Sequence, residues 1–205
     1  MTNTGKGSRT QAERRAHSRR AVLDSACKLF GARGYADTSL EEIAADCGLT
    51  IRPIYHYFGN KKALFAAVNE VMEQRIVDSL EAQSASMAEY WSRFLQLCED
   101  PGFRRIVLID SPNILGRERW NSSIVTQTAL ATFAGNDGKN PRKRFRANLF
   151  NRVTMGAFAE AALAVADAED VAMARVEAEQ LMAQLFDGKV QLLCKKPWQQ
   201  SAARD

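Results

Sequence analysis

The side chains best suited to chemistry lie near the N-terminal end, and they suit anion binding better than catalysis. Residues 1–62 hold 11 of the 28 Lys and Arg residues but 6 of the 24 Asp and Glu residues, an excess of five positive charges. Lys61 and Lys62 follow Asn60 at the predicted start of a helix, where the helix dipole disfavours ammonium groups. Nearby phosphates would offset this cost, because neutralised phosphates release counterions and supply affinity. The asymmetry points to nucleic acid or an anionic membrane, although charge alone leaves open a merely solvated tail.

Catalytic and metal chemistry find little support. The only two histidines are His17 and His56, and G-x-S-x-G, H-E-x-x-H, G-x-G-x-x-G and P-loop patterns are absent. Four cysteines form no C-x-x-C pair and have no zinc-like spacing: Cys27, Cys47, Cys98 and Cys194. We expect them to be free thiols in a reducing compartment. We therefore predict no catalytic residues, no metal and no cofactor, and an enzyme is the disfavoured alternative.

Local start and stop signals predict short helices around these basic residues. Apolar residues recur on one face between about Ala12 and Gly34, which predicts a first helix that ends at the glycine. Thr38 and Ser39 each precede a glutamate by three residues, the pattern of a capping box. A short second helix is therefore predicted to begin there and to end at Gly48.

A third short helix follows at once. Thr50 can cap it, Pro53 is tolerable as its third residue, and Gly59 ends it. Two short helices joined by a glycine-containing turn, over Ser39–Phe58, predict a helix-turn-helix whose second helix enters the DNA major groove. Asn60 is then expected to cap a longer fourth helix.

One run of this unit is specific enough to identify a family. The sequence from Gly48 to Phe65, GLTIRPIYHYFGNKKALF, resembles the recognition element of the TetR family of bacterial transcriptional regulators. The residues at 38–40 and 43–44 also match, so the close resemblance covers about residues 15–70. Ile106–Trp120 is similar to a segment in the ligand-binding domain of some members. The resemblance implies a homodimeric, sequence-specific DNA-binding regulator, most often a repressor. A cytoplasmic location is expected because the N-terminus is polar and basic and has no apolar signal region.

The resemblance also implies residue roles. It implies phosphate contacts through hydroxyl or backbone N–H groups at three positions, Thr38, Ser39 and Thr50. Tyr55 would contact a base edge or a thymine methyl, His56 and Tyr57 would reach phosphate or base, and Lys61 would bind phosphate. The alternatives are that both tyrosines simply pack with wet hydroxyls and that His56 is an uninvolved surface residue.

The sequence departs from the family pattern just after Thr50. Members often carry a basic residue followed by a small one, whereas this chain has Ile51, Arg52 and Pro53. We expect Arg52 to contact guanine, as arginine commonly does. The contact pattern at the neighbouring two positions cannot be carried over from the family.

The rest of the chain is predicted to be helical, which gives an all-α fold of about nine helices. Expected breaks lie near Ser84, at 100–102, at Ser111–Pro112 and at 135–141. The predicted organisation is a disordered basic tail over 1–13, the helix-turn-helix domain over 14–60, a helical ligand-binding and dimerisation domain over 61–189, and a tail over 190–205. The apolar stretch Ile106–Ile109 is interpreted as helix, because no segment alternates with the period of a strand.

Dimer and effector sites are expected in the second domain. Arg142–Ala168 is rich in small residues and the helix after it has an apolar stripe, so two such helices from each subunit would form a four-helix interface, as in the family. Large apolar side chains are the candidates for an apolar or amphipathic ligand: Trp91, Phe94, Phe103, Trp120, Phe133, Phe150 and Met155. Most of them also suit an ordinary core.

The expected partners are a palindromic operator in double-stranded DNA, a second copy of the chain and an unidentified effector. No membrane is expected, because no apolar run approaches the roughly 20 residues that span a bilayer. The alternative is a ligand-independent regulator that responds to a partner protein or to oxidation of Cys27 or Cys47.

Overall fold

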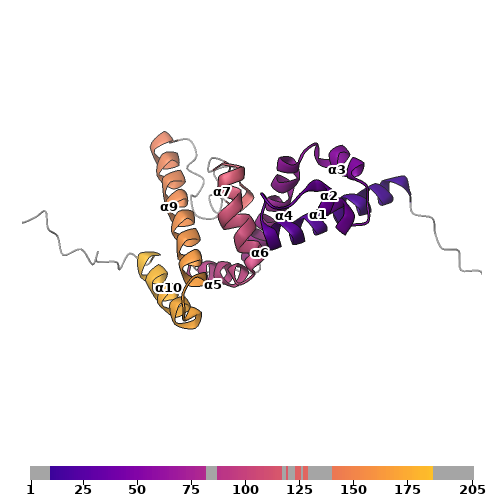
Figure 1. Cartoon of the computed structure of the whole chain (residues 1–205). Helices are drawn as coiled ribbons and strands as arrows, with labels where there is room; N and C mark the ends of the chain where they lie inside the picture. Colours follow the sequence, from indigo (N-terminus) through magenta and orange to yellow (C-terminus); the bar gives the residue numbers. More distant parts are fainter. Residues whose placement is uncertain are drawn as a thin grey trace, which may run out of the picture.

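The computed structural model describes residues 10–81, 87–116, 119, 123–125, 127–128 and 140–186. Within these residues every regular element is helical, which confirms the predicted all-α fold. The N-terminal helices gather at one end of the molecule, and the last two helices lie at the other (Figure 1).

Three helices form the N-terminal unit: α1 (Gln11–Arg33), α2 (Leu40–Asp46) and α3 (Ile51–Phe58). The helix α1 begins at Gln11, one residue before the predicted start at about Ala12, so residues 11–13 are helical although the predicted domain division placed them in the tail. The cause is a capping box, in which Thr10 Oγ1 accepts the Glu13 N–H at 3.2 Å and Glu13 Oε2 accepts the Thr10 N–H at 2.7 Å.

The helix α4 (Lys61–Glu81) links this unit to the rest of the chain. Asn60 caps it as predicted, because its Oδ1 accepts the Ala63 N–H at 2.8 Å. Its apolar face is fully buried at Leu64, Phe65 and Val68 near the N-terminal unit. Farther along, α4 packs against α5 (Met87–Cys98), so a single helix contributes to the cores of both halves.

The helices α6 (Pro101–Arg104), η1 (Arg105–Asp110) and α7 (Ser111–Ile114) follow one another as one helical run. The predicted break at Ser111–Pro112 is therefore wrong. The run is π-helical before the proline, and the Ser111 N–H bonds to the Ile106 carbonyl five residues back. This wider turn displaces the carbonyls that a proline would otherwise meet, so Pro112 continues the helix.

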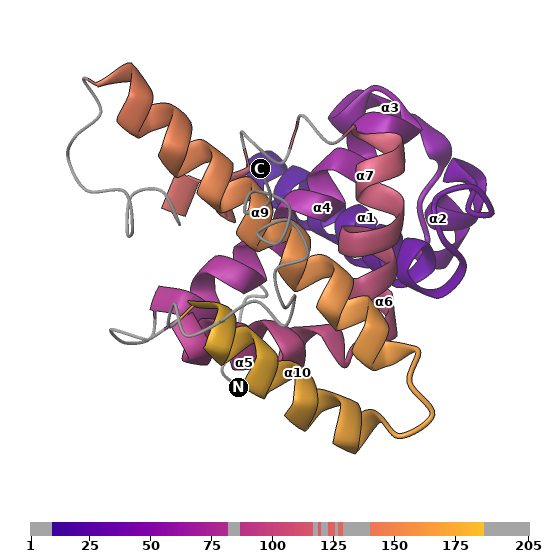
Figure 2. The same ribbon diagram turned by 90° about the vertical axis from the view of Figure 1, so that its left-hand side faces the viewer.

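The helices α9 (Pro141–Ala166) and α10 (Val171–Phe186) pack against each other and against α5 (Figure 2). By length and composition α9 could cross a membrane, contrary to the expectation from its apolar runs, but core helices of soluble proteins meet the same description. Only 18% of its most apolar window is buried within the chain. Most of this apolar window is therefore exposed in the single chain.

Candidate nucleic-acid interface

The eight-residue helix α3 is held from one side only. Ile54 is fully buried in the core of the N-terminal unit, while Arg52, Tyr55 and His56 are exposed. Tyr55 keeps 51% of its surface accessible, although its side chain is large and aromatic. The helix thus presents an arginine, a tyrosine and a histidine on its free face. These are groups that hydrogen-bond to base edges or phosphates.

Thr50 occupies the N-cap position of α3 without using its side chain as a cap. The residue is exposed, so its hydroxyl is available to an external acceptor. At the other end of α3, Tyr57 is partly buried, and its ring centroid lies 5.5 Å from that of His56. The Arg19 guanidinium lies 5.1 Å from the Phe58 ring, which places a further cation from α1 beside this helix.

Two predicted phosphate contacts are engaged inside the protein. Thr38 is 1% exposed, and its hydroxyl donates to the carbonyl oxygens of Gly34 and Leu29, at 2.9 and 3.3 Å. Ser39 caps α2, accepting the Glu42 N–H at 3.1 Å while its hydroxyl donates to the Glu42 carboxylate at 2.9 Å. The Thr38 hydroxyl is therefore not accessible to DNA, and the sequence pattern marks a structural capping position at Ser39.

The Glu42 carboxylate is a well-stabilised anion at this corner. Hydrogen bonds from the Ser39 backbone N–H and hydroxyl, followed by the Arg33 guanidinium, lower its pKa to about 2. Arg33 Nη1 lies 2.6 Å from Glu42 Oε1. The carboxylate therefore stays charged across the physiological range and fixes the start of α2, while it partly neutralises Arg33.

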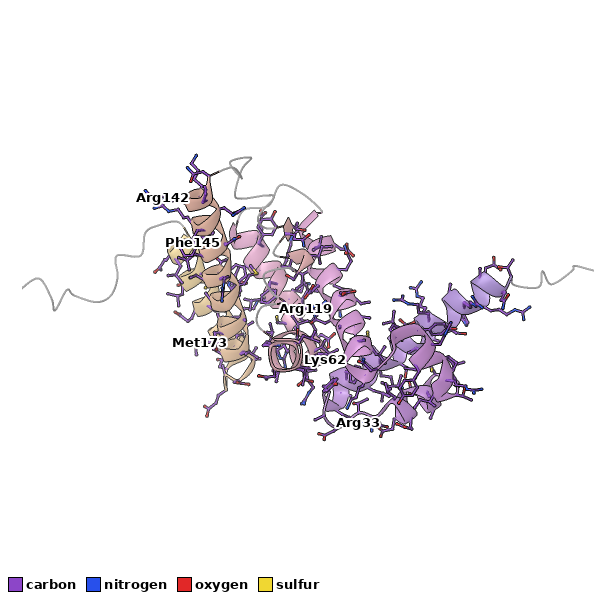
Figure 3. All side chains as sticks on the ribbon, turned by 90° about the horizontal axis from the view of Figure 1, so that it is seen from above. Arg33, Lys62, Arg119, Arg142, Phe145 and Met173 are labelled. Atoms are coloured by element: carbon purple, nitrogen blue, oxygen red, sulfur yellow. The ribbon has the colours of Figure 1, made fainter. Side chains whose placement is uncertain are left out.

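Lys61 is positioned by two contacts with the connection between α1 and α2. Its Nζ lies 4.4 Å from the centre of the Tyr35 ring and donates to the Ala36 carbonyl at 3.3 Å. An ammonium group has three donors, and the bond to the Ala36 carbonyl uses one of them. The neighbouring Lys62 is exposed, and its place between the two halves of the molecule is labelled in Figure 3.

The cysteines of the described residues are poorly suited to sensing oxidants. Burial, with a smaller contribution from Asp24, raises the pKa of Cys27 to about 11, and burial raises the pKa of Cys98 to about 12. Both remain thiols at neutral pH, and the thiolate is the reactive form. Cys47 is partly buried and its thiol donates to the Ala44 carbonyl at 3.5 Å. These environments disfavour the thiol-switch alternative, above all at Cys27.

The predicted effector residues do not form one group. Trp91 and Phe94 both contact Phe158: the Trp91 ring is tilted against it, with centroids 4.8 Å apart, and the Phe94 ring stacks on it at 5.9 Å. Phe103 lies apart in α6, beneath the Arg75 guanidinium, while Phe150 is half exposed on α9. The remaining candidates are Met155, partly buried against the core, and Trp120 and Phe133, which lie outside the described residues.

Sequence reasoning missed Phe158, because a stretch rich in alanine gave no sign that one aromatic residue faces α5. The group formed by Trp91, Phe94 and Phe158 contains an unpaired donor. Trp91 is 1% exposed, and its indole N–H has no hydrogen-bond partner among the described residues. Buried indole N–H groups usually have a partner.

Comparison with known proteins places both halves of the chain in known families. Residues 22–68 match the family model described as bacterial regulatory proteins, tetR family. Residues 84–189 match the model described as tetracyclin repressor-like, C-terminal domain. Together the two matches cover most of the chain.

Individual relatives agree with these matches. The chain is 41% identical over 59 residues to the HTH-type transcriptional regulator AcrR of Shigella flexneri, a match covering 29% of the chain and 27% of that protein. It is 36% identical over 70 residues to the regulator LmrA of Bacillus subtilis, covering 32% and 37%. The matched segments thus span less than half the length of these curated relatives. A solved TetR-family transcriptional regulator from Pectobacterium atrosepticum is 27% identical to the chain, with a TM-score of 0.59. The match covers 88% of this chain and 97% of that protein's chain.

Proposed function

Since the chain belongs to the TetR family and is a DNA-binding transcriptional regulator, we propose that it is a homodimeric repressor released from its operator by a small apolar or amphipathic effector. The observation that carries the proposal is the free face of α3, where Arg52, Tyr55 and His56 are exposed opposite the buried Ile54. We propose a cytoplasmic location, since the operator lies in the bacterial chromosome. The relatives are regulators and not enzymes, which supports the same interpretation.

The proposed interface has a base-contacting part and a phosphate-contacting part. Arg52 and Tyr55 would contact base edges, and His56 and Tyr57 would contact a base or phosphate. Thr50 and Lys61 would contact phosphate, the former through a hydroxyl that makes no capping bond. We leave Thr38 out of the interface because its hydroxyl is buried and bonded, and we retain Ser39 only through its backbone.

The proposed dimer uses the outer apolar faces of α9 and α10. Large exposed apolar side chains cluster on these two helices: Phe145, Leu149, Phe150, Val153, Val171, Met173, Val176, Leu181 and Leu185. Monomeric proteins rarely expose large contiguous apolar patches, so the concentration of exposed apolar side chains on these helices supports an interface here. Phe145 and Met173 project from this outer side in Figure 3. A two-fold axis through it would present two α3 helices to half-sites about 34–36 Å apart or a multiple of that.

The proposed effector site lies at Trp91, Phe94 and Phe158. Its walls are aromatic, and the unpaired Trp91 indole N–H would donate to an oxygen or nitrogen acceptor of the ligand. Effector binding would favour a form in which the two α3 helices no longer match operator spacing, with α4 as one connection between the sites. A ligand shifts such an equilibrium only by its differential affinity for the two forms.

A ligand screen with Trp91 as reporter tests this effector site. In a protein with Trp120→Phe and Trp198→Phe, we expect an effector to change Trp91 fluorescence and to weaken operator binding at the same concentrations. Trp91→Phe keeps the apolar wall but removes the donor, so effector affinity should fall about fivefold to tenfold, the loss of one hydrogen bond. A compound that releases DNA with unchanged affinity for Trp91→Phe would exclude this site.

A further inference from the structure

A hydrogen bond joins the N-terminal unit directly to the π-helical segment of the second half. The Tyr35 backbone N–H, just after α1, donates to Asp110 Oδ2 at 2.7 Å in a partly buried setting. Asp110 is the last residue of η1 and lies 75 positions away in sequence. π-helical turns are rare and occur often at functional sites. The bond is therefore a contact between elements that local sequence does not bring together.

The backbones around this bond approach closely. A Cβ built on Gly31, in the last turn of α1, would lie 3.0 Å from the Gly102 Cα of α6. Gly34 ends α1 at φ 88°, and a Cβ there would lie 3.3 Å from both the Arg105 and the Asp110 side chains. The end of α1 is thus seated against α6 and η1 without intervening side chains of its own. A displacement of η1 must either carry Tyr35 with it or break the bond.

The side chain of Tyr35 reaches the other way, toward the proposed DNA interface. Its ring packs at 5.1 Å from Phe65 and at 5.9 Å from Phe30, and the Lys61 ammonium lies over it at 4.4 Å. The same ammonium donates to the carbonyl of Ala36, the next residue. One residue therefore holds Asp110 with its backbone and supports Lys61 with its ring.

We propose that Asp110 is a positioning residue of the DNA interface, which fixes Tyr35 and thereby holds the Lys61 ammonium in place for a backbone phosphate. The inference rests on the proposed phosphate contact of Lys61. It gives η1 a connection to Lys61, at the start of α4, that does not run along the length of that helix. Movement of η1 on effector binding would then weaken phosphate binding directly, besides any change in the spacing of the two α3 helices.

A double-mutant cycle on binding to a mixed-sequence DNA duplex tests the inference without knowledge of the operator. Lys61→Ala should make the fall of log affinity with log salt less steep by about one unit. It should also lower the affinity at low salt by about fivefold to tenfold. Asp110→Ala should reproduce at least half of both changes on a logarithmic scale. In the Lys61→Ala background, Asp110→Ala should cause no further loss of affinity or of salt slope, because the positioned group is already gone.

The sign of the effect separates positioning from charge. Removing a negative charge near the interface strengthens DNA binding by itself, so weaker binding of Asp110→Ala cannot come from electrostatics. Asp110→Asn keeps an oxygen acceptor for the Tyr35 N–H and should bind DNA at least as tightly as the parent protein. Should Asp110→Ala fail to fold by circular dichroism, Tyr35→Leu removes the ring beneath Lys61 and should give the same loss of salt slope.

Three results would overturn the inference and leave the proposed regulator function intact. The first is an Asp110→Ala variant with the parent salt slope. The second is an Asp110→Ala loss that persists fully in the Lys61→Ala background. The third is a Lys61→Ala variant with an unchanged slope, which would leave Asp110 nothing to position. Failure of the parent protein to bind any DNA would instead contradict the proposed function itself.

Discussion

Arg52→Ala and Tyr55→Ala are each expected to weaken operator binding by about tenfold to a hundredfold, while binding to unrelated DNA changes far less. A good bidentate contact, such as Arg52 could make to a guanine edge, contributes about 1–3 kcal/mol of discrimination, and each 1.4 kcal/mol is tenfold in affinity; Tyr55 would contribute a hydrogen bond to a base edge or a contact with a thymine methyl. Both side chains are exposed in the free protein, so thermal stability should barely change. Competition between operator and mixed-sequence duplex, followed by fluorescence anisotropy, measures the difference.

The matched control is Arg142→Ala, which removes an exposed arginine at the start of α9, far from α3 in Figure 3. It carries the same change in charge and should leave both affinities close to those of the parent protein. If Arg52→Ala instead weakened operator and unrelated DNA equally, Arg52 would be a phosphate contact. The departure from the family pattern at 51–53 would then contribute nothing to specificity.

Val153→Glu is expected to abolish the dimer at micromolar concentrations and to weaken operator binding at least a hundredfold. Val153 is 63% exposed within one chain, on the apolar outer face of α9. A two-fold interface would bury the new carboxylate twice, and unpaired buried charges are strongly destabilising. Each monomer would then contact a single half-site. Sedimentation or light scattering measures the mass, and circular dichroism should show that the monomer remains folded.

Val71→Glu provides the control, since Val71 is also exposed but lies on α4, which is not one of the two helices of the proposed interface. It should stay dimeric and bind operator normally. A Val153→Glu protein that remained a dimer would exclude this face of α9 as the interface. The apolar surface of that helix would then require another partner.

Local signals were sufficient to predict the helices of the proposed interface. The bounds of α3 follow from the N-cap position of Thr50 and from Gly59, which has a φ of 80°. The burial of Ile54 follows from its position among exposed polar neighbours. Both features depend on residues within a few positions of one another, where capping and turn chemistry act.

Contacts between distant segments were beyond prediction from the sequence. Thr38 was expected to offer its hydroxyl to phosphate, but that hydroxyl bonds to carbonyls four and nine residues earlier at the end of α1, because the connection to α2 folds back onto that helix. The same holds for the Tyr35–Asp110 bond and for Phe158, which face partners far away in sequence. Pro112 misled the prediction because a π-turn removes the clash that a proline causes in an α-helix.

Selection of genomic DNA fragments by the purified full-length protein at physiological salt tests the regulator proposal most directly. Sequence-specific regulators bind their sites about 10³–10⁷ times more tightly than unrelated DNA, so repeated selection should enrich one short palindrome. Its half-site spacing should be one helical turn or a multiple of it, and Arg52→Ala should relax the preference at a guanine within each half-site. Recovery of random DNA alone, from a protein that is folded and dimeric, would contradict an effector-released repressor that binds its operator when free of ligand.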